Sequence, residues 1–248
     1  MLLPLSAFPL PEYASQSVLA GSAVIVIDLL RASTTIATAL AHGATEVIPF
    51  QTPESALASR KSTNLLGGER NGIRIPGFDL GNSPLEYTRS RVHSRRISFT
   101  TTNGTRAILH ADAGSANVIT IGSLVNLSAV SDFISKLNLP VNILCAGTGG
   151  RVSLEDCLAA GAFIERLTAN PLRAHHTIEA DDQALMMLKL WRSESPGLGR
   201  LQEAVSSSAG GRNLLALGFS LDIRECIRID SHPVVPVFHR GTKTITLR

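Results

Sequence analysis

The stretch VIVIDLLRASTTIATALAHG, residues 24–43, decides the fold class. It opens with VIVID (24–28), a continuous β-branched run that is typical of a strand buried on both faces of a sheet. TTIATALAHG (34–43) follows, rich in alanine and closed by Gly43, which predicts a buried helix with a glycine stop. The two segments together form a β-α unit joined by a short polar loop.

The same order recurs along the rest of the chain. Further elements are predicted as strands at 46–50 and 64–68, a helix at 53–61, and strand–turn–helix successions over 96–111, 117–137 and 141–167. The C-terminal part predicts a helix at 183–191 capped by Asp181 or Asp182, a helix near 200–206, a glycine turn, and strands near 223–229 and 234–238. Alternating strands and helices predict a layered α/β/α fold with a largely parallel or mixed sheet.

A length of 248 residues fits one domain, residues 1–248, with a possible division into two α/β subdomains near residues 120–140. Segments 24–43 and 141–161 share the order apolar strand, polar loop, alanine-rich helix and glycine. Either an internal duplication or the general form of any β-α unit accounts for this similarity. We also expect a homo-oligomer, because many small enzymes form symmetric dimers.

Composition narrows the class of protein. Hydrophobic residues make up 44% and charged residues 17% of the chain, as in soluble globular proteins. A net charge of +3 is too small to indicate a nucleic-acid partner, and no apolar run approaches the ~18 residues of a membrane span. Three cysteines and no signal-peptide pattern predict a cytoplasmic location. The basic residues are 19 arginines and four lysines, and arginine suits oxyanions; a high genomic G+C content would also favour it.

Polar residues follow the predicted strands at their carboxyl ends, where α/β sheets bind ligands. Asp28 ends the first strand, Arg31 follows, and Ser33 and Thr34 lie where the helix begins. Free N–H groups at a helix N-terminus bind anions. The alternative is purely structural, with Ser33 as a helix cap and Asp28 paired with Arg31.

TTTNGTR (100–106) is a second polar segment that follows a predicted strand and could bind an anion. Its hydroxyls and Arg106 could hold an oxyanion at a turn signalled by Asn103-Gly104. An ordinary strand–helix turn is the alternative.

CAGTGGRVSLEDC (145–157) allows two interpretations. Cys145 and Arg151 have the Cys-x5-Arg spacing of cysteine-dependent phosphatases, although a buried and inert thiol is common at the end of an apolar strand. Glu155 and Asp156, which start a helix after a glycine-rich loop, instead suit Mg²⁺ or simply complement the helix dipole.

Two further segments have weaker signals. His175 and His176 are adjacent, which is poor spacing for a shared metal ion and indicates a solvated pair. Arg212 in GGRN (210–213) could add to an anion site.

Four stretches together resemble one known family. They are VIDLLRASTTI (26–36), GGERNGIRIPGFDLGNSPLEY (67–87), TTNGTRA (101–107) and the pair CAGTGG and SLEDCLAAG within 145–161. In this order and at these separations they resemble the 2-phosphosulfolactate phosphatases, which are known from coenzyme M biosynthesis. The resemblance runs from about residue 20 to about residue 240.

The resemblance implies a Mg²⁺-dependent hydrolase of α/β fold with two associated halves. Its substrate would be a small anionic phosphorylated acid, 2-phosphosulfolactate, converted to 3-sulfolactate and phosphate. The family pattern also places Glu69, Arg70, Asp79 and Asn82 in the site.

Roles within the site follow as expectations. The metal would be held by some of five carboxylates, those of Asp28, Glu69, Asp79, Glu155 and Asp156. One of these carboxylates would act as general base or as a covalent nucleophile. The groups expected to bind or polarise the substrate are Arg31, Ser33, Thr34, Arg70, Asn82, Thr101, Thr102, Asn103, Gly104, Arg106 and Arg151. Asp28, Arg31, Glu69, Asp79, Asn103 and Arg106 are expected to take part in catalysis.

Three alternatives remain open at this stage. A cysteine-dependent phosphatase would use Cys145 and Arg151 and would resist chelation of metal. A phosphatase of another small phosphorylated acid would share the chemistry and differ in substrate. A binder without catalysis would show saturable anion binding and no phosphate release.

Overall fold

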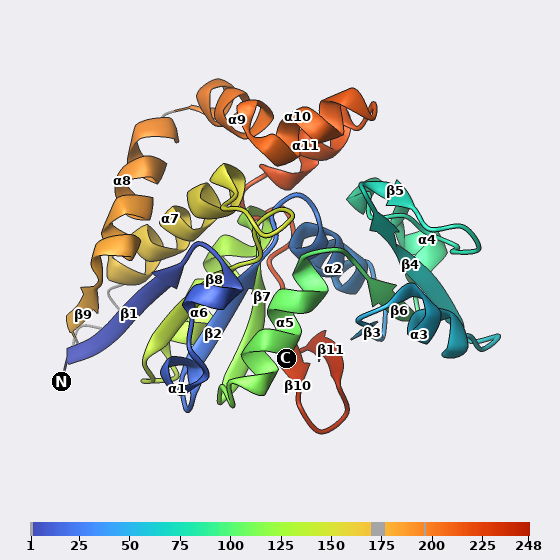
Figure 1. Ribbon diagram of the computed structural model, residues 1–248, viewed down its shortest axis with the longest axis horizontal. Helices are drawn as coiled ribbons and strands as arrows, with labels where there is room; N and C mark the ends of the chain where they lie inside the picture. Colours follow the sequence, from blue (N-terminus) through green and yellow to red (C-terminus); the bar gives the residue numbers. More distant parts are fainter. Residues whose placement is uncertain (1, 170–176, 196) are drawn as a thin grey trace.

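A computed structural model describes residues 2–169, 177–195 and 197–248, so His175 and His176 lie outside the described residues. One mixed sheet runs through the molecule, in the order β5-β4-β6-β3-β11-β10-β7-β2-β8-β1-β9 (Figure 1). Its strands are β1 (Leu2–Phe8), β2 (Ala23–Ile27), β3 (Glu46–Pro49), β4 (Asn64–Arg70), β5 (Ile73–Arg74), β6 (Arg96–Thr100), β7 (Val118–Gly122), β8 (Val141–Cys145), β9 (Thr177–Ala180), β10 (Pro236–His239) and β11 (Thr244–Leu247).

The sheet consists of two parallel blocks joined by an antiparallel hairpin. One block is β4-β6-β3, and the other is β7-β2-β8-β1-β9. The C-terminal hairpin β10–β11 lies between them and pairs antiparallel with β7 on one side and β3 on the other. The predicted mixed α/β sheet is thereby confirmed. The predicted division into subdomains near residues 120–140 stays a prediction.

Helices cover the sheet on both faces, as Figure 1 shows. The longer ones are α2 (Ala32–Ala41), α5 (Gly104–Ala113), α6 (Leu127–Ser135), α7 (Leu154–Thr168), α8 (Asp182–Glu194), α9 (Leu198–Ser207), α10 (Ala209–Ala216) and α11 (Ser220–Cys226). Short elements are η1 (Pro11–Tyr13), α1 (Gln16–Leu19), α3 (Pro53–Ala58), η2 (Pro84–Glu86), α4 (Arg89–Val92) and η3 (Leu124–Asn126). Among the described residues, no helix is both long and apolar enough to cross a membrane.

Strand β2 lies in the middle of the larger block and is fully buried. Ile25 and Ile27 point into the core beneath α6, α7 and α8, whereas Val24 and Val26 point into the core beneath α2 and α5. This two-sided burial explains why the sequence of β2 is continuously apolar instead of alternating. The prediction made from residues 24–43 is confirmed.

Two predictions for the C-terminal part are wrong. Residues 223–229 were expected to form a strand, but Ser220–Cys226 form helix α11. The spacing of the apolar residues in 221–229 is compatible with a strand or with a helix. Burial in the folded chain selects the helix: Ile223 and Cys226 are buried, whereas Leu221 and Ile229 are exposed. The expected glycine turn lies inside α10, where Gly210 and Gly211 allow close packing against Glu155 and the backbone of Ser206.

The packing of α7 on α8 yields a test of the fold. A Cβ atom at Gly161 would lie 2.6 Å from Cβ of Trp191 and would also clash with the carbonyl of Met187. We expect Gly161→Ala to lower the free energy of unfolding by about 1–3 kcal/mol, because the two helices must separate. Gly199→Ala in α9, where nothing lies within 4 Å, is the matched control and is expected to be neutral or stabilising by up to ~1 kcal/mol. Equal urea midpoints for the two variants would contradict this interpretation of the packing.

Candidate active site

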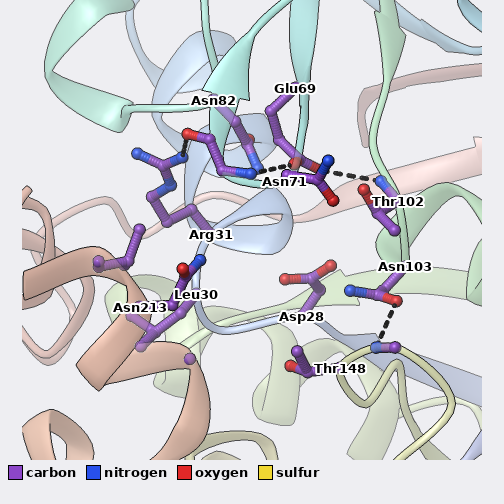
Figure 2. A pocket seen from close by; sticks show the side chains of 14 residues that line it. Asp28, Leu30, Arg31, Glu69, Asn71, Asn82, Thr102, Asn103, Thr148 and Asn213 are labelled. Atoms are coloured by element: carbon purple, nitrogen blue, oxygen red, sulfur yellow. Dashed lines mark hydrogen bonds between the residues drawn. The ribbon is translucent and has the colours of Figure 1, made fainter. Parts of the chain in front are cut away.

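A polar cavity of about 240 Å³ opens at the carboxyl ends of the central strands (Figure 2). Six residues predicted from the sequence line it: Asp28, Arg31, Glu69, Asn82, Thr102 and Asn103. They come from the end of β2, the start of α2, β4, the loop before η2, and the loop between β6 and α5. Strand ends far apart in the sequence are thus adjacent in space, as expected for an α/β sheet.

Asp28 lies at the floor of the cavity, directly after β2. Its Oδ1 atom accepts a hydrogen bond from the backbone N–H of Ala32, 3.3 Å away, in the first turn of α2. Gly104 begins α5 on the other side, and a Cβ atom there would lie 2.8 Å from Oδ2 of Asp28. The glycine therefore lets the N-terminus of α5 approach this carboxylate closely.

The environment of Asp28 opposes ionisation. The pKa of this carboxyl is raised from 3.8 to about 7: burial is the largest cause, the negative charges of Glu69 and Glu155 add to it, and the backbone N–H groups of Ala32 and Gly104 oppose the increase. Desolvation and like charges thus prevail over two helix N-termini. A cation in the cavity would reverse this balance.

Glu69 lies across the cavity from Asp28 (Figure 2). Its Oε1 atom accepts a hydrogen bond of 2.8 Å from the backbone N–H of Thr102, and its Oε2 atom accepts one of 2.8 Å from Gly72. The side chain is only 7% exposed. Two backbone donors therefore fix the direction in which this carboxylate points.

Asn103 has a fixed amide orientation. Its Oδ1 atom accepts a hydrogen bond of 3.2 Å from the backbone N–H of Gly149, so the amide nitrogen lies on the side that faces Asp28 (Figure 2). Asn103 can donate to an anion in the cavity from this position.

Arg31 lines the cavity, and its guanidinium already has several partners within the protein. Its Nη1 atom donates to Oδ2 of Asp222 at 2.6 Å, and both side chains are 2% exposed. Its Nη2 atom donates to the carbonyl of Gly72 at 2.7 Å, and its guanidinium lies 4.5 Å over the ring of Phe219. The charge of Arg31 is therefore balanced locally before any substrate binds.

Several predicted site residues lie outside the cavity wall. Asp79 accepts a hydrogen bond from the backbone N–H of Leu66 at 2.8 Å and lies 3.5 Å from Arg60. Arg106 is exposed and pairs with Glu12 at 3.1 Å. Arg151 and Arg212 are also exposed and do not line the cavity. Arg70 donates to the carbonyl of Glu69 and to the hydroxyl of Thr100. The structure does not bring these groups together with Asp28.

Three predicted hydroxyl residues shape the loops around the site. The Ser33 hydroxyl accepts a hydrogen bond of 2.8 Å from the backbone N–H of Asp28. Thr34 donates to the carbonyl of Leu29, and the Thr101 hydroxyl accepts from the backbone N–H of Thr105. They hold the backbone at the ends of β2 and β6. The structural alternative for this segment is wrong in its details, because Ser33 does not cap α2 and Arg31 pairs with Asp222 instead of Asp28.

Glu155 and Asp156 lie behind the cavity and do not line it. Both oxygens of Asp156 are occupied, by the backbone N–H groups of Leu29 at 2.8 Å and Gly147 at 3.0 Å. Burial and the charge of Asp28 raise the pKa of Asp156 well above its usual value, and burial also raises that of Glu155. Asp156 thus links the loops that follow β2 and β8.

The cysteine alternative lacks an accessible nucleophile. Cys145 is completely buried at the end of β8, and a hydrogen bond with Cys157, together with burial, raises the pKa of its thiol. Arg151 is exposed on the loop that follows. A thiolate attack requires an accessible, low-pKa cysteine, and Cys145 has neither property.

Other residues that line the cavity were not predicted. They are Leu30, Asn71, Gly72, Thr148, Gly149, Gly210, Asn213 and Leu214. Asn71 and Gly72 form the turn between β4 and β5 with φ of 54° and 81°, and this Asn-Gly pair is a turn signal that was available in the sequence. Asn213 and Leu214 belong to α10, and nothing in its sequence distinguishes them.

The fold and cavity define an α/β protein with a site at the carboxyl ends of its parallel strands, between helix N-termini and acidic side chains. A family model described as 2-phosphosulpholactate phosphatase matches residues 9–241. The chain therefore belongs to the 2-phosphosulfolactate phosphatase family, a family of phosphoric monoester hydrolases. The resemblance proposed from the four sequence motifs is confirmed.

Similar proteins cover nearly the whole chain. A protein of Symbiobacterium thermophilum named probable 2-phosphosulfolactate phosphatase is 45% identical over 227 residues, which are 90% of this chain and 94% of the relative. Proteins with the same name from Carboxydothermus hydrogenoformans and Thermotoga maritima are 42% and 39% identical, each over 88% of this chain and over 86% and 89% of the relatives.

The buried carboxyl of Asp28 predicts an unusual dependence of stability on pH. The unfolded chain ionises this group near 3.8 and the folded chain near 7, so the native state binds more protons between these values. Its contribution to stability therefore decreases as the pH rises through this window. In metal-free buffer, we expect Asp28→Asn to be more stable than the wild type at about pH 8, by roughly 2–4 kcal/mol, and to lose this advantage toward about pH 4. Urea unfolding across this range measures the difference, and a difference independent of pH would contradict the assignment.

Proposed function

We propose that this protein is a Mg²⁺-dependent phosphatase that hydrolyses 2-phosphosulfolactate to 3-sulfolactate and phosphate. The observation that carries the proposal is the charge of the cavity. Among the described residues that line it, the charged side chains are those of Asp28, Glu69 and Arg31, and Arg31 is already paired with Asp222. An acidic cavity excludes a multiply charged anion unless a cation enters with it.

The residues present fit a magnesium ion. Mg²⁺ prefers oxygen ligands and is commonly held by one or two carboxylates, with water and substrate phosphate completing its shell. Asp28 and Glu69 provide two carboxylates, and Oδ1 of Asn82 is a buried oxygen without a hydrogen-bond partner within the described part of the chain. Among these described residues, no group of three or more His, Cys, Asp or Glu side chains could hold a metal, so water and substrate would have to complete the shell of the ion.

The position and hydrogen bonds of the five carboxylates predicted as metal ligands reduce this set to two. Asp28 and Glu69 would hold the ion. Asp79 lies outside the cavity, and Asp156 uses both oxygens on backbone donors. Glu155 lies behind Gly210 and adds negative charge near Asp28.

The chemistry divides between the ion and the chain. Bound Mg²⁺ would supply Lewis-acid polarisation of the phosphoryl oxygens. The amide of Asn103 and the N-terminus of α5 would donate to the phosphoryl group and stabilise charge as the ester bond breaks. One of the two carboxylates that line the cavity, Asp28 or Glu69, would accept a proton from the attacking water.

Phosphate release from three substrates tests the reaction and the substrate together. We expect 2-phosphosulfolactate to react faster than 2-phospholactate and phosphoglycolate with Mg²⁺, and EDTA to abolish all three activities. Mg²⁺-dependent phosphate release without a preference for 2-phosphosulfolactate would support the phosphatase activity but contradict the proposed substrate. Another small phosphorylated acid would then be the substrate. Activity that survives EDTA would contradict the metal mechanism, and anion binding without release would indicate a binder.

Two matched carboxylate variants test the assignment of the site. Glu69→Gln is expected to lower kcat/KM by about 100-fold or more, since loss of a few kcal/mol of transition-state stabilisation has this effect. Asp79→Asn is the control: its amide oxygen can still accept from Leu66, so we expect kcat/KM to change by less than about threefold. Cys145→Ser is expected to remain active and insensitive to thiol alkylation. A large loss of kcat/KM in Asp79→Asn would instead indicate that Asp79 belongs to the active site.

A further inference from the structure

Asp222 is a buried acid that neither the sequence motifs nor the cavity lining reveals. It lies on α11, 191 positions after Arg31, and both of its oxygens are occupied. Oδ2 accepts from Nη1 of Arg31 at 2.6 Å, and Oδ1 accepts from the hydroxyl of Ser83 at 2.7 Å. Its side chain is 2% exposed, so these contacts are shielded from water.

A continuous chain of hydrogen bonds leads from Asp222 to Glu69. Arg31, held by Asp222, donates through Nη2 to the carbonyl of Gly72 at 2.7 Å. The N–H of the same glycine donates to Oε2 of Glu69 at 2.8 Å. Figure 2 shows the last two of these contacts converging on the turn between β4 and β5. Four polar groups from α11, the start of α2, this turn and β4 are thus connected in series.

Gly72 connects Arg31 to Glu69, because its carbonyl accepts from the former and its N–H donates to the latter. Its φ of 81° lies in the left-handed region, which glycine adopts without strain. A Cβ atom there would lie 2.6 Å from Cδ1 of Leu217 and 3.3 Å from Nδ2 of Asn213. The turn therefore fits tightly between Arg31 and the end of α10, and its position depends on both.

Charge explains why Asp222 is needed. A guanidinium that is 2% exposed is costly unless an anion compensates it. The ring of Phe219 covers one face of Arg31 but cannot neutralise the charge. Without Asp222, Arg31 would be a buried cation without a paired anion, lining the same cavity as the carboxylates of Asp28 and Glu69.

We infer that Asp222 is a positioning residue for the metal-binding carboxylate of Glu69. It holds Arg31 against the β4–β5 turn and keeps the positive charge of Arg31 away from the cavity acids. This inference rests on the proposed function, because it assigns Asp222 a role in binding a divalent cation. The hydrogen-bonded series itself does not depend on that function.

The test uses two measurements on the full-length protein without substrate. Mn²⁺ binding, followed by electron paramagnetic resonance, reports the affinity of the cavity for a divalent cation. Amide hydrogen exchange of residues 64–74 reports how firmly the β4–β5 turn is held. We expect Asp222→Asn to weaken Mn²⁺ binding by about tenfold or more and to speed exchange in this segment.

Asp112→Asn is the matched control. Asp112 is also a buried acid, 8% exposed, and it pairs with Arg240 and Lys243 at the far end of α5. Its replacement also removes the charge of a buried acid from ion pairs, here with two more exposed cations, and Asp112 has no contact with the cavity. We expect it to leave both Mn²⁺ affinity and exchange of residues 64–74 unchanged.

Ser83→Ala makes the test independent of whether Asp222→Asn folds. This variant removes one hydrogen bond to Asp222 and no charge, and we expect a smaller weakening of Mn²⁺ binding, about threefold, with faster exchange. If Asp222→Asn folds and retains either the wild-type affinity for Mn²⁺ or the wild-type rate of hydrogen exchange, the inference is overturned. If Asp222→Asn does not fold, the same result for Ser83→Ala overturns it. A wild-type protein that binds no Mn²⁺ would instead overturn the proposed metal dependence, and exchange alone would then decide whether Asp222 holds the turn.

Discussion

The carboxylate of Asp28 is buried at the end of the central strand, and much of the surrounding structure is arranged around it. The strand that presents it is apolar and buried on both faces, and the Asp28 side chain is only 8% exposed where it lines the cavity. The N-termini of α2 and α5 approach it from two sides, and Gly104 is required for the second approach. The like charges of Glu69 and Glu155 lie nearby, so the ionised form of this carboxyl is unfavourable unless it binds a proton or a cation.

The C-terminal hairpin β10–β11 decides whether Glu69 can face Asp28. Glu69 belongs to the small parallel block and Asp28 to the large one, and the hairpin joins these blocks into one sheet. The cavity thus lies between parts of the chain that share no local sequence relation. Its acidic lining and the absence of a free lining arginine among the described residues distinguish it from a site that binds anions by positive charge alone.

The arginines illustrate what composition leaves undecided. The 19 arginines indicated oxyanion binding, yet Arg106 and Arg151 are exposed outside the cavity, and Arg70 and Arg31 are committed to neighbouring groups. Sequence motifs locate a residue on a strand end or loop but do not show which partner occupies it. Asp79 shows the same limit, because a backbone N–H and Arg60 occupy a carboxylate that its motif placed in the site.

The sequence by itself determined the α/β class, the central strand and its following helix, the family, and six of the residues that line the cavity, because hydrophobic period and turn chemistry are local properties. Only the tertiary structure decided the order of the strands, the helix at residues 220–226, the contribution of α10 and the pairing of Arg31 with Asp222. These features depend on contacts between distant segments. The apolar residues around Ile223 fit a strand or a helix equally well until burial against the rest of the chain selects one.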